Sequence, residues 1–400
     1  MIDEVEAIER ILSFAPKPEI EEVDLVDASG RYLLEELRAT VAVPGFDQSA
    51  MDGYALRSKD LGSDGGHLRI SGLSAAGGGN PGVLEAGEAM RIFTGAPLPE
   101  GCDAVVMQEN TLDEGGKLIV NQEVKKGECV HRKGDVICRG QLIASPGDRL
   151  NPGLLGLIAS QGYSSLRVAG WPRAAVITTG DELVDPAVGA LEPGQIFNSN
   201  ASMLQVSLRR LGIQNVDLYH VDDQLQTTIE VIRMAMQRSQ LVLIVGGVSV
   251  GGRDQVKPAL EECGVNVEFW RVRIKPGKPL LYASFGEDGQ LFGLPGNPVS
   301  ALVTFAIFVL PAVQRRLGAC DGNLGMRRLT ARSLSSIANP SDRPHYVRGI
   351  FDGDAGFLAS ACQTSHNIMG LAQSNALARI AARTSVSCGD RLTVFLLWED

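Results

Sequence analysis

Three short apolar runs, each ending in glycine, constrain the fold of this chain more than any other feature of its sequence. They read AAVITTG at 174–180, LVLIVGG at 241–247 and FGLPG at 292–296, and helical stretches lie between them. Buried strands that alternate with helices in this way are typical of an open α/β sheet. Because such sheets bind ligands at the carboxyl ends of their strands, we expect a ligand site near these glycines.

The rest of the chain predicts further domains, since 400 residues exceed one ordinary domain. Residues 1–40 and 141–171 show helical periodicity, with a brief extended stretch. Residues 41–140 are dense in glycine and in short β-prone runs, which predicts an all-β module. The α/β domain then covers 172–319, and β-prone segments at 320–400 predict a small C-terminal β domain.

The charge balance limits the possible partners. A formal net charge of −10 argues against a general nucleic-acid or membrane-surface binder, which would need a basic field. The seven cysteines include no CxxC pair, so we expect reduced, buried thiols in a cytosolic protein rather than a disulfide framework or a zinc site. The apolar run 301–313 is too short for a membrane span and contains Pro311, so we predict a buried helix.

In so acidic a chain, an anionic ligand needs a local basic pocket, and the run KPGKP at 275–279 is a candidate. Lys275 and Lys278 lie three residues apart, and each is followed by a proline that stiffens the backbone. Lysine binds phosphate as a point charge, so the run predicts an anion site. The alternative is an ordinary strand-to-strand turn between WRVRI and LLYAS, with both lysines in water.

The strand ends carry further polar groups. TTGDEL at 178–183 offers Asp181 and Glu182, which suit a hard cation such as Mg²⁺, or else cap a turn and face solvent. GGVSVGGRD at 246–254 lets the backbone approach a ligand closely; Ser249 could bond that ligand, and Asp254 could instead cap a helix.

LPGNPVSA at 294–301 places Asn297 and Pro298 at a helix start, which is either an anion site or a common cap. Together the four runs predict a phosphate-bearing ligand with a divalent cation. They contain no histidine, which argues against a histidine base and a serine hydrolase.

Two loops of the β module are also rich in polar groups. PGFDQSAMDGYAL at 44–56 contains Asp52, and FTGAPLPEG at 93–101 contains Thr94. A large ligand contacted by both modules, across a subunit boundary, would explain these loops. Turn chemistry alone explains them equally well.

In this order, the runs PGFDQSAMDGYAL, IFTGAPLPEGCDAVVMQE, ITTGDEL, IFNSN, GGVSVGGRD, KPGKP and LPGNPVSA resemble the molybdopterin molybdenumtransferase family, known as MoeA in bacteria and as the gephyrin E domain in animals. The resemblance implies a multidomain protein. Its domains would be a helical linker domain (1–40 and 141–171), a β domain inserted into it (41–140), a molybdopterin-binding α/β domain (172–319) and a C-terminal β-barrel (320–400). It also implies a cytoplasmic homodimer whose active sites are lined by both subunits.

The implied reaction inserts molybdate into adenylylated molybdopterin and releases AMP, with Mg²⁺ as cofactor. The molybdopterin adenylyltransferase and molybdoenzyme acceptors are further partners that the resemblance suggests. No nucleic acid and no membrane enter the reaction.

The resemblance also implies roles for particular residues. Those that would hold the metal and the phosphates are Glu182 and Asp254, with Asp222 close by. Those that would line the pterin phosphate pocket are Gly246, Gly247 and Ser249. Those that would neutralise or enclose the oxyanion are Lys275, Lys278, Pro295, Asn297 and Ser300. Those that would reach the site from the other domains are Asp52 and Thr94, from the partner's β domain, and Arg348 and Ser365.

One departure from the family concerns Gly134-Asp135-Val136, where the family commonly has Gly-Glu-Asp. Either Asp135 takes over the role of the family's aspartate, which Val136 replaces here, from a shifted position, or the site is altered. The departure leaves open one alternative to the enzyme, a non-catalytic paralogue that binds or delivers the cofactor. The likeness to gephyrin leaves open another, a dimeric scaffold that recruits partners.

Overall fold

The computed structural model describes residues 1–14, 16–248 and 255–397. The chain divides into two compact units. The larger unit comprises Met1–Leu34, Pro146–Leu150 and Leu166–Asp400, and the smaller unit comprises Glu35–Ser145 and Asn151–Ser165. The proposed boundaries of four domains stay a prediction.

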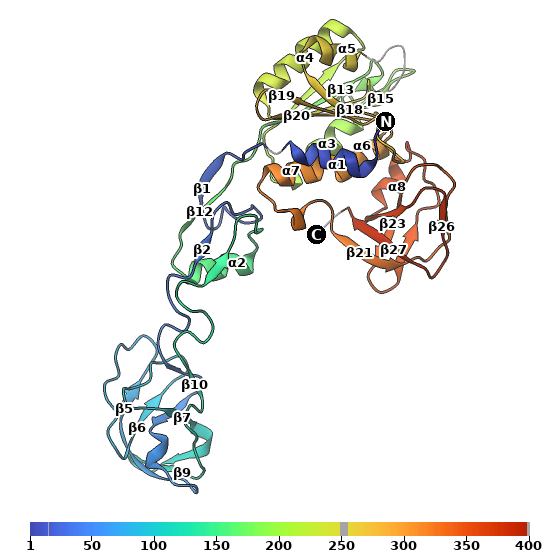
Figure 1. Cartoon of the computed structure of the whole chain (residues 1–400). Helices are drawn as coiled ribbons and strands as arrows, with labels where there is room; N and C mark the ends of the chain where they lie inside the picture. Colours follow the sequence, from blue (N-terminus) through green and yellow to red (C-terminus); the bar gives the residue numbers. More distant parts are fainter. Residues whose placement is uncertain (15, 249–254, 398–400) are drawn as a thin grey trace. The chain divides into compact units, whose positions relative to one another are not determined.

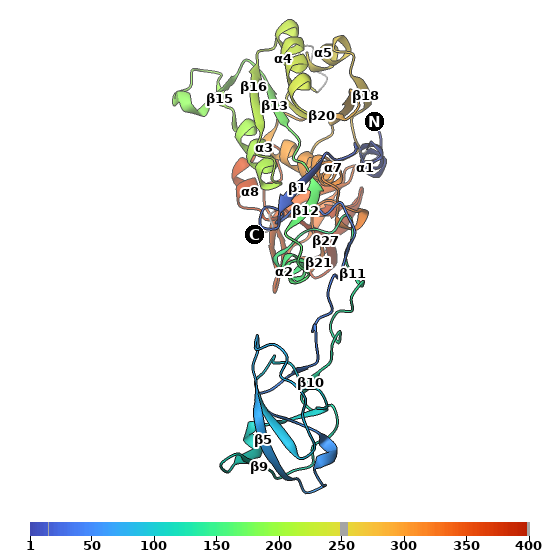
Figure 2. The ribbon, with the colours of Figure 1, turned by 90° about the vertical axis from the view of Figure 1, so that its left-hand side faces the viewer.

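The larger unit contains a six-stranded sheet (Figures 1 and 2). Its strands, in spatial order, are β16 (Val216–Val221), β13 (Ala174–Thr179), β17 (Leu241–Val245), β20 (Gly289–Leu294), β19 (Leu281–Phe285) and β18 (Asn266–Trp270). The first four are parallel, and the last two are antiparallel to their neighbours. The predicted α/β sheet is therefore confirmed. β13, β17 and β20 are buried along their whole length, which explains why their sequences are mostly apolar.

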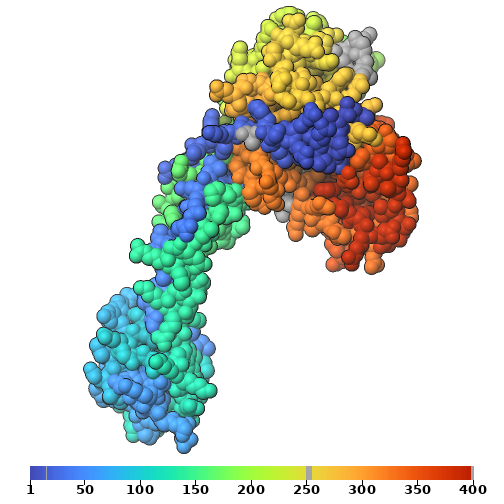
Figure 3. Space-filling model, in the orientation of Figure 1, coloured from blue at the N-terminus to red at the C-terminus, as the bar shows by residue number. Residues whose placement is uncertain are grey.

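Helices cover both faces of this sheet (Figure 1). On one face, α4 (Leu225–Arg238) and α5 (Val256–Glu262) share a core with the strands. On the other face lie α3 (Ser199–Arg210), α1 (Glu4–Ser13) and a long helix of three segments. Figure 3 shows α1 on the surface along that long helix, and its apolar face contributes Ala7 and Ile11 to the core.

The long helix runs from Pro298 to Arg316 as α6 (Pro298–Thr304), a π-helical turn (Phe305–Val309) and α7 (Leu310–Arg316). Its 19 residues are long and apolar enough to cross a membrane by length and composition alone. However, 78% of its most apolar window is buried inside the protein, so it is a core helix, as predicted from the sequence. Pro311 is the second residue of α7 and follows directly on the π-helical turn, which interrupts the regular α-helical hydrogen bonds there.

The C-terminal part of the larger unit is an antiparallel sheet. Its strands, in spatial order, are β21 (Arg328–Arg332), β27 (Arg391–Leu396), β25 (Ala376–Ile380), β23 (His345–Asp352) and β24 (Gly356–Ala359). β22 (Ile337–Asn339) pairs with β26 (Thr384–Val386), and α8 (Ile368–Ala372) precedes β25. The predicted C-terminal β structure is confirmed, while its closure into a barrel stays a prediction.

The smaller unit is also rich in β structure. Its main sheet contains, in spatial order, β7 (Ala104–Met107), β4 (Gly53–Leu56), β6 (Glu88–Ile92), β5 (Gly66–Ser74), β9 (Lys117–Val120) and β8 (Thr111–Asp113). Shorter pairs join β3 (Gln48–Ser49) to β10 (Val130–His131) and β2 (Leu37–Arg38) to β11 (Leu142–Ala144), beside α2 (Pro152–Ser160). In the larger unit, β1 (Ile20–Asp24) pairs with β12 (Ser165–Ala169), of which only Ser165 is assigned to the smaller unit.

The cysteines correct one expectation from the sequence. All seven are free thiols, but none is buried: Cys138, Cys320, Cys362 and Cys388 are exposed, and the other three are partly exposed. The prediction of buried thiols was therefore wrong. The exposed thiols lie in turns and loops, and composition does not reveal that placement.

Candidate functional site

A basic cleft of about 640 Å³ lies in the larger unit. The described residues that line it are Lys275, Pro276, Gly277, Lys278, Pro279, Ser300, Arg343, Gln363, Thr364, Ser365 and His366. Four of the predicted site residues are thus brought together, namely Lys275, Lys278, Ser300 and Ser365. No acidic side chain is among the lining residues, although the chain carries a net charge of −10. The cleft is the local basic pocket that an anionic ligand would need.

The 275–279 turn joins β18 to β19, and it also lines the cleft. The two interpretations of this run, a strand-to-strand turn and an anion site, therefore describe the same segment. Gly277 is buried and has a φ of +105°. A β-carbon at Gly277 would lie 2.3 Å from the Cγ2 methyl of Thr304 on α6. Glycine therefore lets the turn pack against the long helix, which places half-buried Lys275 and exposed Lys278 on the cleft wall.

Backbone hydrogen bonds join the two walls of the cleft. The N–H of Lys275 donates to the carbonyl of Pro344 at 2.9 Å, and the N–H of Tyr346 donates to the carbonyl of Lys275 at 2.7 Å. On the α6 side, the N–H of Val299 donates to the carbonyl of Ser365 at 3.3 Å. The α/β sheet and the C-terminal sheet therefore build one preorganised cleft.

Arg343 lines the cleft and was not singled out by the sequence analysis. Its Nη1 donates to the carbonyl of Ile274 at 3.0 Å, directly before Lys275. Beside it, His345 is 5% exposed. Burial, together with the charges of Lys275, Arg348 and Arg343, lowers the pKa of His345 to about 4. The imidazole of His345 is thus neutral at pH 7, and Lys275, Lys278 and Arg343 supply permanent positive charge to the cleft.

Arg348 requires a correction, because it is not among the residues that line the cleft. It is 1% exposed, and its guanidinium donates to the carbonyls of Asn367 (2.8 Å), Cys362 (3.0 Å) and Thr364 (3.1 Å). These carbonyls belong to the 362–367 loop, whose outer face lines the cleft. Arg348 therefore supports the loop from inside, and burial lowers the pKa of its guanidinium.

The predicted glycines lie at the carboxyl edge of the α/β sheet, next to the point where the strand order reverses between β13 and β17. Gly246 and Gly247 have φ values of +95° and +61°. A β-carbon at Gly246 would lie 2.7 Å from Oγ1 of Thr179. Only glycine therefore fits where β17 ends beside β13.

The acidic residues follow the same edge. Glu182 comes after β13 and Asp222 after β16, and both are exposed. The carboxylate of Asp181 accepts from the N–H of Asp223 at 2.9 Å, so Asp181 caps a turn, as its alternative interpretation proposed. Within residues 1–14, 16–248 and 255–397, no three acidic, histidine or cysteine side chains cluster as a metal site. Ser249 and Asp254 lie outside the described residues.

The sheet edge and the basic cleft are two neighbouring sets of residues rather than one pocket. Glu182 and Asp222 do not line the cleft, nor do Pro295 and Asn297. The 294–300 segment connects the two sets: the N–H of Gly246 donates to the carbonyl of Leu294 at 3.2 Å, and Ser300 lines the cleft.

Asn297 occupies the N-cap position of α6, but its side chain makes no capping hydrogen bond. The predicted outward-facing N–H groups are only partly free, because the N–H of Val299 is bonded to the C-terminal loop.

In the smaller unit, Asp52 and Thr94 lie side by side. Oδ1 of Asp52 accepts from the backbone N–H (2.7 Å) and from the hydroxyl (2.8 Å) of Thr94, and these bonds lower the pKa of Asp52. Asp135 instead accepts from the N–H of Arg132 at 2.6 Å, which ties its carboxylate into a local turn. Val136 beside it is 70% exposed.

Comparisons with known proteins agree with this architecture. Family models match in three places: the MoeA N-terminal region (domain I and II) at residues 2–162, a probable molybdopterin binding domain at 175–315, and the MoeA C-terminal region (domain IV) at 330–397. The chain is 34% identical to a molybdopterin molybdenumtransferase of Haemophilus influenzae, over 97% of each chain. It is 34% identical to a protein of the same name from Nostoc sp., over 97% of this chain and 92% of that relative.

Among solved structures, a molybdopterin biosynthesis MoeA protein from Pyrococcus horikoshii is similar with a TM-score of 0.85 at 25% identity. The similarity covers 99% of this chain and 100% of that one.

Proposed function

This chain belongs to the MoeA family, and we propose that it is a molybdopterin molybdenumtransferase, which inserts molybdate into adenylylated molybdopterin and releases AMP during molybdenum cofactor synthesis. The observation that carries the proposal is the basic cleft, where Lys275, Lys278 and Arg343 converge without an acidic neighbour among the lining residues. Molybdate is a compact dianion, and charge-assisted hydrogen bonds from ammonium and guanidinium groups are the strongest that a protein offers it.

The chain's own residues would work mainly by position and charge. Lys275, Lys278 and Arg343 would hold the oxyanion, and Ser300, which also lines the cleft, would donate to it through its hydroxyl. Neutral His345 behind them leaves the cations as the source of the field. The adenylate phosphates would lie at the sheet edge, where Gly246 and Gly247 permit close approach of the backbone. The 294–300 segment connects the two sets, so one elongated substrate could span both.

Mg²⁺ is part of the proposal, and the described residues fit it. Glu182 and Asp222 are exposed carboxylates at the ends of neighbouring parallel strands. Proteins commonly hold Mg²⁺ through one or two carboxylates and complete its shell with substrate phosphates and water. Bound there, the ion would neutralise charge on the pyrophosphate link as that link breaks. Asp254 would join this set, but it lies outside the described residues.

The assembly and the location also belong to the proposal. We expect a homodimer in which Asp52 and Thr94 of one subunit reach the active site of the other, and their shared hydrogen bonds already fix the carboxylate. We expect a cytoplasmic protein, because seven free thiols suit a reducing compartment. The adenylyltransferase that makes the substrate and the acceptor molybdoenzymes remain proposed partners.

The test supplies purified protein with adenylylated molybdopterin, molybdate and Mg²⁺, and measures AMP by chromatography. We expect AMP in step with molybdenum cofactor, and a loss of at least about tenfold in rate for Lys275→Ala, because one charge-assisted contact is removed. Lys117→Ala, which removes an exposed lysine from β9 of the smaller unit, is the matched control and should be unchanged. If no AMP is released with any divalent ion, the proposed enzyme activity is refuted.

Exposed Val136 favours one alternative, a paralogue that binds the cofactor without turnover. Because Asp135 is tied into its turn, it is poorly placed to replace a missing aspartate at 136. On this alternative, the wild-type protein binds substrate tightly without releasing AMP, and Val136→Asp restores release. If wild-type turnover equals that of Val136→Asp, position 136 is irrelevant to activity.

A further inference from the structure

The 340–344 turn, which connects β22 to β23, carries Arg343 from the C-terminal sheet to the cleft. Arg343 is partly buried, and its bond to the carbonyl of Ile274 joins it to the base of the lysine turn. A guanidinium presents five N–H donors in a fixed fork, so this one bond sets the direction of the others. This bond and the position of the Arg343 backbone together direct the remaining donors of the guanidinium.

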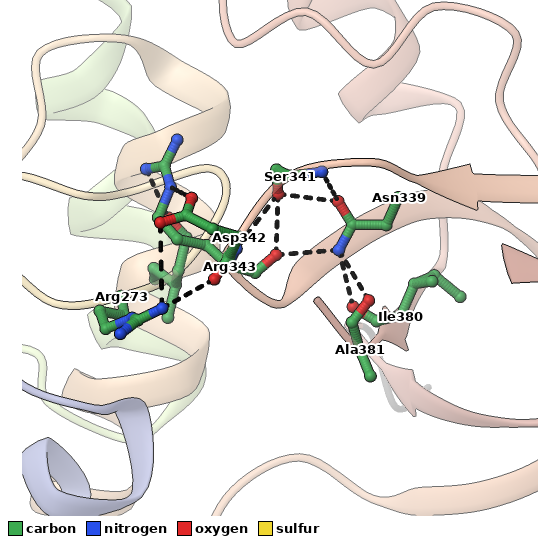
Figure 4. A network of polar contacts seen from close by, with 8 residues as sticks. Arg273, Asn339, Ser341, Asp342, Arg343, Ile380 and Ala381 are labelled. Atoms are coloured by element: carbon green, nitrogen blue, oxygen red, sulfur yellow. Dashed lines mark hydrogen bonds and ion pairs between the residues drawn. The ribbon is translucent and has the colours of Figure 1, made fainter. Parts of the chain in front are cut away.

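A buried amide bonds this turn to the C-terminal sheet. Asn339 is 1% exposed, and its Nδ2 lies 2.8 Å from the carbonyl oxygen of Arg343, 2.9 Å from that of Ala381 and 3.2 Å from that of Ile380. Figure 4 shows Asn339 between the turn and the end of β25. Its Oδ1 accepts from the hydroxyl of Ser341 at 2.8 Å. The amide thus ties the turn to the C-terminal sheet from both of its polar ends.

Ser341 completes the connection. Its hydroxyl lies 2.9 Å from the carbonyl of Arg343 and 3.3 Å from the N–H of the same residue. Both backbone polar groups of Arg343 are therefore bonded to Asn339 or Ser341. Such a buried and satisfied network restricts the backbone to one arrangement.

The neighbouring ion pairs are weaker candidates for this task. Asp342 is 57% exposed; its carboxylate lies 3.8 Å from Nε of Arg343 and 3.9 Å from Nη2 of Arg273. Exposed pairs at such distances contribute little, because water screens them. The guanidinium of Arg273 also donates to the carbonyl of Asp342 at 3.0 Å, but both of these side chains are exposed. The buried amide is thus the stronger constraint on the turn.

We propose that Asn339 is a positioning residue for the oxyanion cleft, which acts through Ser341 and the backbone of Arg343. The inference rests on the proposed function, because it takes the cleft to bind molybdate. Asn339 itself does not line the cleft. Its effect on an anion should therefore disappear when Arg343 is absent.

The experiment measures molybdate affinity by titration calorimetry, with tryptophan fluorescence to verify folding. We expect Asn339→Ala to weaken molybdate binding about tenfold, which is the loss of roughly one well-aligned hydrogen bond to a charged group. Asn375→Ala is the matched control, because Asn375 makes two bonds to the backbone of Phe351 in the same sheet without lining the cleft. It should lower stability and leave molybdate affinity unchanged.

A double-mutant cycle with Arg343→Ala distinguishes positioning from general destabilisation. We expect Asn339→Ala to have no further effect on affinity once Arg343 is removed. Ser341→Ala, which leaves the buried amide in place, is the second variant should Asn339→Ala not fold, and we expect it to weaken binding about threefold through the lost hydroxyl bonds.

An unchanged affinity in the variants at 339 and 341, or an equal loss with and without Arg343, would overturn the inference alone. A wild-type protein that binds no molybdate would overturn the proposed function and this inference with it.

Discussion

Replacing Arg348 by methionine tests how the cleft is supported. The guanidinium is 1% exposed and donates to three carbonyls of the 362–367 loop, at 2.8, 3.0 and 3.1 Å. A buried acceptor that loses its donor costs about 1–3 kcal/mol. Because Cys362 and Thr364 are exposed and water can reach their carbonyls, we take the lower end for each. Arg348→Met should then lower the free energy of unfolding by about 3 kcal/mol.

The assay is urea unfolding followed by tryptophan fluorescence. Trp171 and Trp270 belong to the larger unit, and the sequence of the smaller unit contains no tryptophan, so the signal reports the unit that holds Arg348. Arg348→Lys keeps the charge but lacks the planar fork that reaches three carbonyls, so it should recover only part of the loss. Molybdate affinity should fall in both variants, because the loop forms one wall of the cleft. If the free energy of unfolding of Arg348→Met lies within about 1 kcal/mol of the wild-type value, Arg348 does not support the loop.

Three further predictions concern the same unit. Burial lowers the pKa of His345 from 6.5 to about 4, so its contribution to the free energy of unfolding is complete above pH 6.5 and is lost as pH falls toward 4. Urea unfolding should therefore show that the free energy of unfolding falls by about 2 kcal/mol from pH 8 to pH 5. This fall should be absent in His345→Gln. Gly277→Ala, which combines a positive φ with a clash against α6, should cost about 3 kcal/mol by the same assay, whereas Gly264→Ala, with a positive φ in open space in the same unit, should cost only about 1 kcal/mol. Arg379→Ala should cost about 3 kcal/mol, because it leaves the buried carboxylate of Glu4 without its cation, and an equally stable variant would contradict this.

Local chemistry in the sequence was enough to predict the α/β sheet and the lysine turn. Apolar runs that end in glycine specify buried strands with tight exits, and Gly246 and Gly247 occupy such exits in the structure. Lys275 and Lys278 were recognisable because two prolines and a glycine fix a short segment around them. In both cases the information lies within a few residues of the chain.

The rest of the cleft depends on contacts between distant segments. The run DRPHYVRG contains two arginines five residues apart, and nothing in it distinguishes Arg343 on the cleft from Arg348 in the core. Their difference arises because Arg348 lies in a buried strand and Arg343 in the turn before it. Likewise, the sequence predicted that the side chain of Asn297 caps the helix. In the structure that side chain makes no capping bond, and the N–H of Val299 at the helix start donates to the carbonyl of Ser365 instead. Sequence periodicity does not specify such tertiary contacts.

The central claim is that an acidic protein binds molybdate in one basic cleft. The most direct measurement is the anomalous X-ray signal of molybdenum in crystals soaked with molybdate. We predict one peak within hydrogen-bonding distance of Lys275, Lys278 and Arg343. A peak elsewhere, with this cleft empty, would contradict the account.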